Sequence, residues 1–202
     1  MRPDLTVYIV EDDASVRESL VLLLGMTGYR TRAFSDAESF LSAWQPAWVG
    51  CVVADLRLPG MSGVALQVRV QEQGATLPFI IVTAHGDVSS ARAAFRAHAV
   101  DFLEKPFDHA QLKSAIQKAF DMEGGRIERE AARQHESEKL RKLTSREREV
   151  LDLAARGLHA KEIAAKLGIS PRTVEVHKTR IMEKLEVRNV AELVRFALAS
   201  GD

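Results

Sequence analysis

Residues 49–63, VGCVVADLRLPGMSG, set the architecture of the chain. The run from Val49 to Ala54 is almost entirely apolar, as expected for a central parallel strand that is covered on both faces. Asp55 ends this strand, and the Pro–Gly and Ser–Gly pairs that follow it are turn signals ahead of a helix. Ligands of open α/β sheets bind beyond the carboxyl ends of the strands. Asp55 is therefore either a reactive group in such a site or an ordinary helix-capping carboxylate.

The composition is that of a globular protein with room for more than one core. The chain has 202 residues, enough for two domains, and 46% of them are hydrophobic. Its one cysteine, Cys51, lies in an apolar strand and cannot form an internal disulfide. We recognise no signal peptide and no apolar run near the ~20 residues that cross a membrane. These features predict a cytoplasmic protein without a membrane partner.

Charge is distributed unevenly along a chain whose formal net charge is zero. Residues 1–120 carry 11 Lys and Arg against 13 Asp and Glu, whereas residues 142–202 carry 12 against 9. The excess of three positive charges in the C-terminal part permits binding to nucleic acid without establishing it.

Five strands alternate with helices in the first 120 residues. The expected strands are residues 5–10, 29–34, 49–54, 78–82 and 100–103. Asp36, Asp87 and Asp108 are placed to cap helices. The segment with Val64, Leu66, Val68 and Val70 alternates like a strand, but the βα rhythm on both sides favours a helix. The pattern predicts a parallel sheet with helices on both faces.

Polar side chains gather where four of these strands end. They are Glu11 and Asp12, Asp55, Thr83, and Lys105. Crowded carboxylates repel one another unless a cation lies between them, and hard oxygen ligands suit Mg²⁺. A lysine and a hydroxyl beside them can hold phosphoryl oxygens. Such a site would allow the Asp55 carboxylate to attack phosphorus and form an acyl phosphate.

The C-terminal residues change character and show four helical patterns without a strand. Residues 121–141 before them are polar, and they are either a solvated linker or an extension of the preceding helix. The helices expected after them are residues 146–156, 160–167, 171–185 and one that begins after Asn189. A short helix, a glycine-containing turn and a longer helix are typical of a helix-turn-helix, whose second helix enters the major groove. A small bundle whose charges only solvate it is the alternative.

Four motifs then identify the first part of the chain. They are VEDD at 10–13, DLRLPGMSG at 55–63, TAHGD at 83–87 and DFLEKPF at 101–107. With them, residues 5–120 resemble the receiver domain of two-component response regulators. The resemblance implies that Asp55 is the phosphoacceptor and that Thr83 and Lys105 complete the reactive site.

The same resemblance implies a metal site and a switch. Glu11, Asp12, Asp55 and the backbone carbonyl of Arg57 would bind Mg²⁺. Thr83 and Phe102 would form the switch pair, although Phe102 lacks the hydroxyl often found at its position. The peptide bond before Pro106 is cis in the family.

The C-terminal motifs LTSREREVLDLAARG, HAKEIAAKLGIS and PRTVEVHKTRIMEKL resemble the LuxR-type DNA-binding domain. The whole chain is thus similar to response regulators of the FixJ/NarL type. The resemblance assigns base-facing roles to Glu175, Val176 and Thr179 and phosphate contacts to Lys178 and Arg180. The complete set expected on DNA is Arg172, Thr173, Glu175, Val176, Lys178, Thr179 and Arg180.

The expected fold is a five-stranded, doubly wound parallel α/β sheet of the flavodoxin/CheY-like kind, with a second, smaller all-α helix-turn-helix domain. The expected division is a receiver at 1–121, a linker, helical in our interpretation, at 122–141 and a DNA-binding domain at 142–202. The expected function is a transcription factor that a sensor histidine kinase phosphorylates on Asp55. It would then dimerise, bind double-stranded promoter DNA and act on RNA polymerase.

Two other classes of function compete with this interpretation. A haloacid-dehalogenase-type phosphohydrolase also uses an Asp nucleophile after a strand, but it needs a second Asp at the position of Arg57. A small-molecule-sensing activator with the same DNA-binding domain would need a cavity in its sensor, where this chain has a carboxylate cluster. We therefore expect the chain not to be an enzyme.

Overall fold

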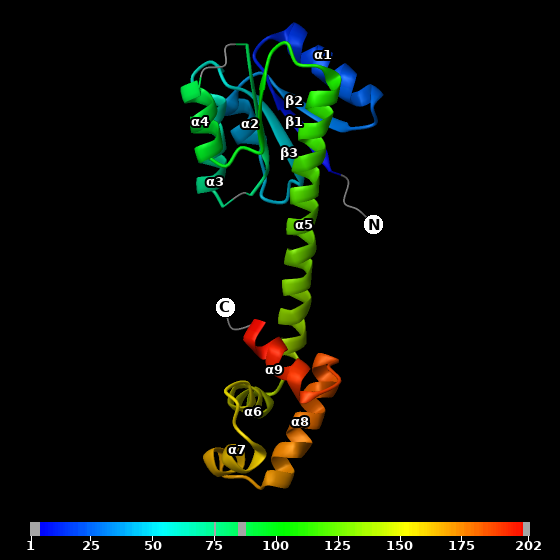
Figure 1. Cartoon of the computed structure of the whole chain (residues 1–202), viewed down its shortest axis with the longest axis vertical. Coiled ribbons are helices and arrows are strands. Elements are labelled where there is room, and N and C mark those ends of the chain that lie inside the picture. Colours follow the sequence, from blue (N-terminus) through cyan, green and yellow to red (C-terminus); the bar gives the residue numbers. More distant parts are fainter. Residues whose placement is uncertain (1–4, 75, 85–87, 200–202) are drawn as a thin grey trace. The chain divides into compact units, whose positions relative to one another are not determined.

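A computed structural model describes residues 5–74, 76–84 and 88–199. The chain divides into two compact units, Met1–Ile127 and Glu128–Asp202 (Figure 1). Each unit has its own apolar core. The expected helix cap Asp87 lies outside the described residues. Within the described part of the chain, no helix is both long and apolar enough to cross a membrane.

The first unit contains a five-stranded parallel sheet. The strands are β1 (Thr6–Val10), β2 (Arg30–Phe34), β3 (Gly50–Asp55), β4 (Phe79–Thr83) and β5 (Asp101–Glu104). Their order across the sheet is β2-β1-β3-β4-β5, and every neighbouring pair is parallel. The three inner strands are almost completely buried, which explains their continuous apolar sequences. The sheet predicted from the sequence is confirmed.

Helices cover both faces of this sheet, as predicted. They are α1 (Ala14–Met26), α2 (Ala37–Ala43), α3 (Gly63–Glu72), α4 (Val88–Arg96) and the first part of α5 (His109–Arg141). Helices α1 and α5 lie on one face, and α2, α3 and α4 lie on the other (Figure 1). Asp36 caps α2 as expected, with its carboxylate accepting a hydrogen bond from the Ser39 amide. The alternating segment after β3 is indeed a helix, because burial of Leu66 and Val70 follows helical spacing.

Two apolar layers hold the sheet between the helices. On the α2–α4 side the core contains Phe40, Leu66 and Phe79, and on the α1 and α5 side it contains Leu24 and Ile116. All five side chains are buried. Burying each such side chain contributes about 1.5–3 kcal/mol relative to leaving it in water. The strand ends described below are therefore fixed by cores on both sides.

Helix α5 continues well beyond the sheet, to Arg141. It passes through Gly124 and Gly125, which together cost a helix about 2 kcal/mol relative to two alanines. Just before them, the buried carboxylate of Glu123 accepts two hydrogen bonds of 2.8 Å from the Arg126 guanidinium. Of the two alternatives for residues 121–141, a solvated linker and an extended helix, the structure has the helix.

The second unit contains the last part of α5 and, among its described residues, four further helices. They are α6 (Ser145–Ala155), α7 (Ala160–Leu167), α8 (Pro171–Leu185) and α9 (Val190–Ala199). Gly168 takes the left-handed conformation between α7 and α8, and Ser170 caps α8 ahead of Pro171. The core is formed by Leu151, Ile163, Val174, Ile181 and Leu193, among other apolar side chains. The helix-turn-helix predicted from the sequence is confirmed.

A buried carboxylate ties α6 to α8. Glu147 is only 3% exposed and forms a capping box with Thr144 at the start of α6. Its Oε2 also accepts a 2.6 Å hydrogen bond from Lys184 Nζ on α8. Burial alone would raise the pKa of Glu147, but the hydrogen bonds from Lys184 and Thr144 lower it to about 2. This carboxylate is therefore charged in the folded protein at any physiological pH.

Stability of the second unit should depend on Glu147 in a pH-dependent way. We expect Glu147→Ala to reduce the free energy of unfolding by about 3 kcal/mol at pH 7, because it removes the cap and leaves Lys184 without its partner. The folded pKa of about 2 lies below the unfolded value of about 4.3, so this stabilisation is complete above that value and is lost as the pH falls towards 2. Calorimetric unfolding of the full chain should show that the gap between variant and parent shrinks by about half at pH 3. Glu149→Ala, which removes an exposed acid of the same helix, is the control and should cost below about 0.5 kcal/mol. An equal gap at both pH values would contradict this role.

Candidate functional site

The register of the sheet brings the predicted polar side chains together. Val10 pairs with Ala54, so Glu11 follows β1 beside Asp55, the last residue of β3. Thr83 ends β4 opposite Glu104, and Lys105 follows directly. Because all strands are parallel, these ends meet at one edge of the sheet. The structure thus collects Glu11, Asp55, Thr83 and Lys105 from four strands, as predicted.

Lys105 joins the two buried carboxylates of this site. Its Nζ lies 2.6 Å from Glu11 Oε2 and 2.5 Å from Asp55 Oδ2. Burial alone would lower the pKa of Lys105, but its hydrogen bonds with Asp55 and Glu11 raise that pKa above its ordinary value. Burial also raises the pKa of Glu11, and Lys105 offsets only part of this effect. The site is therefore a lysine-centred ion-pair network.

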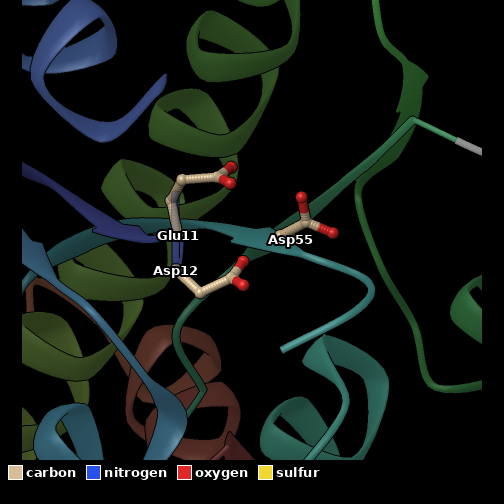
Figure 2. A group of neighbouring side chains, drawn as sticks. All are labelled: Glu11, Asp12 and Asp55. Carbon is tan, nitrogen blue, oxygen red and sulfur yellow. The ribbon is translucent and has the colours of Figure 1, made fainter. Parts of the chain in front are cut away.

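Three carboxylates form a group that fits a divalent cation. One oxygen from each of Glu11, Asp12 and Asp55 lies within 4.8 Å of the others. Figure 2 shows the three side chains beside one another at the ends of β1 and β3. Glu11 and Asp55 are buried, whereas Asp12 is exposed to solvent. Hard oxygen ligands of this kind suit Mg²⁺.

The loop after Asp55 is fixed by close backbone packing. The Arg57 amide donates a 2.8 Å hydrogen bond to Asp55 Oδ1, and the Gly63 amide donates to the Leu56 carbonyl. A Cβ atom on Gly63 would lie 2.3 Å from the Asp55 carbonyl oxygen. Helix α3 can begin this close to Asp55 only because residue 63 is glycine.

Arg17 belongs to the site although the sequence analysis did not identify it. Its guanidinium donates hydrogen bonds of 2.7 Å to the Glu11 carbonyl and 3.1 Å to the Asp12 carbonyl. An arginine on α1 thereby fixes the backbone that presents the two acidic side chains. The guanidinium binds backbone carbonyl oxygens, which every residue has, so no sequence pattern indicated this contact.

The two predicted switch residues occupy neighbouring strands. Thr83 is buried at the end of β4, and Phe102 on β5 is partly buried against the core on the α2–α4 side. The peptide bond between Lys105 and Pro106 is cis, as the resemblance implied.

The second unit presents most of its predicted DNA-contacting residues on one exposed surface of α8. Arg172, Glu175, Val176, Thr179 and Arg180 are exposed. Thr173 is half-buried, and its hydroxyl lies 2.9 Å from that of Ser170 at the start of the helix.

Lys178 differs from this expectation. It is only 8% exposed and lies on the core-facing side of α8 with Val174, Ile181 and Leu185. Positions separated by four, seven and eleven residues share one helical face, so the backbone turns Lys178 inward. This placement speaks against the phosphate contact that the resemblance assigned to Lys178.

Each of the two units matches a known protein family. Residues 7–117 match the family model described as "Response regulator receiver domain". Residues 141–197 match the one described as "Bacterial regulatory proteins, luxR family". The chain is 41% identical to the transcriptional regulatory protein FixJ of Azorhizobium caulinodans over 201 residues, which cover 100% of this chain and 95% of that protein.

Two solved structures, both of response regulators, are similar to nearly the whole chain. The response regulator StyR is 40% identical, with a TM-score of 0.86 over 96% of this chain and 98% of that one. Full-length FixJ from B. japonicum is 39% identical, with a TM-score of 0.59 over 97% of each chain.

The carboxylate group should bind a divalent cation through Asp12. We expect Asp12→Ala to weaken Mn²⁺ binding, used as a spectroscopic substitute for Mg²⁺, by at least tenfold, because a hard oxygen ligand is lost. Electron paramagnetic resonance titration of free Mn²⁺ measures this directly. Glu18→Ala removes an exposed acid of α1 outside the carboxylate group and should leave the affinity unchanged. Equal affinities of parent and Asp12→Ala would show that the group does not hold the cation.

Proposed function

We propose a mechanism for this chain at the level of single residues. The chain belongs to the two-component response regulators of the FixJ type. It combines a receiver domain with a LuxR-type DNA-binding domain. Its function is phosphorylation-dependent regulation of transcription. A receiver domain implies a sensor kinase as partner, and a LuxR-type domain implies DNA. The residues and steps below are our proposal.

Asp55 is the phosphoacceptor in this proposal, and the network around Lys105 carries the assignment. A carboxylate oxygen of Asp55 attacks the phosphorus of a phosphohistidine on the kinase. The new O–P bond forms as the P–N bond breaks, and the imidazole nitrogen keeps the electron pair of that bond. Lys105 already pairs with Asp55, so its ammonium lies within reach of the incoming phosphoryl oxygens.

The carboxylate group supports a divalent cation as the cofactor. Glu11, Asp12, Asp55 and the backbone carbonyl of Arg57 would hold Mg²⁺. When bound, such an ion would supply positive charge that reduces the repulsion of the carboxylates and the phosphoryl oxygens. Arg17 keeps the Glu11 and Asp12 backbone in place for this role.

Thr83 and Phe102 carry the signal to the surface in our proposal. The Thr83 hydroxyl moves towards the phosphoryl group, and Phe102 fills the space that it leaves. This change repacks the face formed by α4 and β5, which then binds a second copy of the chain. The exposed apolar residues of α4 support this surface, because Val88 is 77% and Phe95 is 52% exposed. Arg92 and Arg96 on the same helix are also exposed.

Helix α8 reads double-stranded promoter DNA in the major groove in this proposal. Glu175, Val176 and Thr179 face the bases, and Arg172, Thr173 and Arg180 contact the phosphates. Val176 is well placed for a thymine methyl group, since it is an exposed apolar side chain. The regulator acts on RNA polymerase at the promoter and works in the cytoplasm, where both DNA and polymerase lie.

The two units have different functions in this proposal, and the boundary between them, after Ile127, lies inside the linker. We assign the receiver to residues 1–121, the linker to 122–141 and the DNA-binding domain to 142–202. Dimerisation through the receivers raises the effective concentration of the second DNA-binding domain, so that two half-sites are bound together. The chain is not an enzyme with a separate substrate in this proposal. The second carboxylate that a phosphohydrolase needs two residues after its nucleophile is replaced by the exposed Arg57.

Labelling by a small phosphodonor tests the phosphoacceptor. Acetyl phosphate and Mg²⁺ should add the mass of one phosphoryl group to the full chain, and Asp55→Asn should abolish the addition, because an amide is a poor nucleophile. Intact-protein mass spectrometry measures both. Asp121→Asn, an exposed change at the surface of α5, should label like the parent. Labelling of Asp55→Asn at the parental level would remove Asp55 from its role.

A further inference from the structure

Two charged residues on the recognition helix α8 form a pair whose purpose the fold does not explain. Lys178 Nζ lies 3.2 Å from Glu175 Oε1, and the two residues are separated by three positions. The lysine is buried, whereas the glutamate side chain is 61% exposed. An exposed carboxylate gains little stability from such a pair. A buried lysine paired with an exposed carboxylate therefore points to a role in which the position of that carboxylate matters.

We propose that Lys178 is a positioning residue that holds Glu175 to read a cytosine in the major groove. The proposal rests on the function proposed above, in which Glu175 faces the bases, and it adds the identity of the base. It also gives Lys178 a role that agrees with its burial, in place of the phosphate contact expected from the resemblance.

The position of Glu175 on α8 suits contact with a base edge. The helix begins at Pro171, and Glu175 lies in its N-terminal half, the part of a recognition helix that approaches the bases. The Thr179 hydroxyl donates a 3.1 Å hydrogen bond to the Glu175 carbonyl, so the exposed neighbour one turn on contacts the Glu175 backbone rather than its carboxylate.

A carboxylate in the major groove lies close to the negative charges of the DNA phosphates. Phosphates on both sides of the groove repel it, and burial between protein and DNA removes its water. Lys178 reduces both costs because its ammonium group donates a hydrogen bond to Glu175 Oε1 and so places a positive charge beside the carboxylate. Among the described residues, the other oxygen, Oε2, forms no hydrogen bond, so it is available to accept one from DNA.

The chemistry of the groove then selects the base. The major-groove edges of guanine and thymine offer acceptors that repel a carboxylate, and adenine has its N7 acceptor beside its amino group. Cytosine offers the N4 amino donor without a neighbouring acceptor. A carboxylate fixed in place should therefore prefer a C·G pair, whereas a freely rotating one would discriminate less.

The aliphatic part of Lys178 explains how the ammonium is held. It lies in the buried row of α8 between Val174 and Ile181, and its charged end reaches out of the core towards Glu175. Arginine could keep this pairing, whereas methionine would fill the buried space and lose the charge.

Selection from a random duplex library tests the proposal. The acetyl-phosphate-treated full chain should enrich a motif in which one position per half-site is C. In Glu175→Gln that position should change towards A, since glutamine pairs with adenine N6 and N7, and the preference for C should fall by at least fivefold. Lys178→Met should relax the same position and leave the others unchanged. Lys178→Arg should restore it.

Salt dependence separates this role from a phosphate contact. The slope of log affinity against log salt concentration should be the same for Lys178→Met and the parent. Arg180→Met, which removes an exposed arginine of the same helix, should reduce the magnitude of that slope by about 0.9.

Three outcomes decide the matter. A slope reduced by about 0.9 in Lys178→Met, with base preferences intact, would overturn the positioning role. An unchanged motif in Glu175→Gln would overturn the base contact, and this surface variant decides that point even if Lys178→Met fails to fold. A parent chain that enriches no motif at all would instead refute the proposed function.

Discussion

The contact of one lysine with two buried carboxylates is the interaction on which the candidate site depends. Glu11 follows β1 and Asp55 ends the neighbouring β3, and without a cation between them they would repel each other. Lys105 comes from the far side of β4, and its long side chain reaches past the end of that strand to both carboxylates. The order of the strands and the helices on both faces of the sheet keep these strand ends together. The buried Thr83 lies at the end of β4, between β3 and β5.

The second unit also contains contacts between lysines and carboxylates. Lys184 on α8 pairs with the buried Glu147 on α6, and Lys139 near the end of α5 bonds to the Leu185 carbonyl and to Glu186. The recognition helix is thus attached by lysines at its C-terminal half, while its N-terminal half presents side chains outward. Lysines pair with carboxylates and help to position them in both units. In the first unit the carboxylate is a proposed nucleophile, and in the second it is part of the scaffold or, at Glu175, a proposed reader of bases.

Most of the fold could be predicted from the sequence because local residue patterns specify its helices and strands. Five short strands in a βα rhythm predict a parallel sheet. Parallel strand ends must then share one edge, so the sequence already placed Glu11, Asp55, Thr83 and Lys105 together. The helix at 63–72 needed this wider context, since its own alternation indicated a strand.

Contacts that depend on tertiary geometry could not be predicted in this way. Arg17 binds backbone carbonyls, which have no sequence signature, and the tight approach of Gly63 to Asp55 appears only in three dimensions. Lys178 is a different case. Its spacing of four from Val174 and three from Ile181 already placed it in the apolar stripe of α8, but the resemblance assigned it a phosphate contact.

The central claim is that phosphorylation of the first unit controls DNA binding by the second. Its most direct test is the affinity of the full chain for a duplex carrying two selected half-sites, measured with and without acetyl phosphate and Mg²⁺, with sedimentation velocity on the same samples. The account predicts that labelling converts monomer to dimer and raises the affinity by at least tenfold, because the second DNA-binding domain then binds at high effective concentration. An unlabelled chain that already binds as tightly as the labelled one, or a labelled dimer with no gain in affinity, would contradict it.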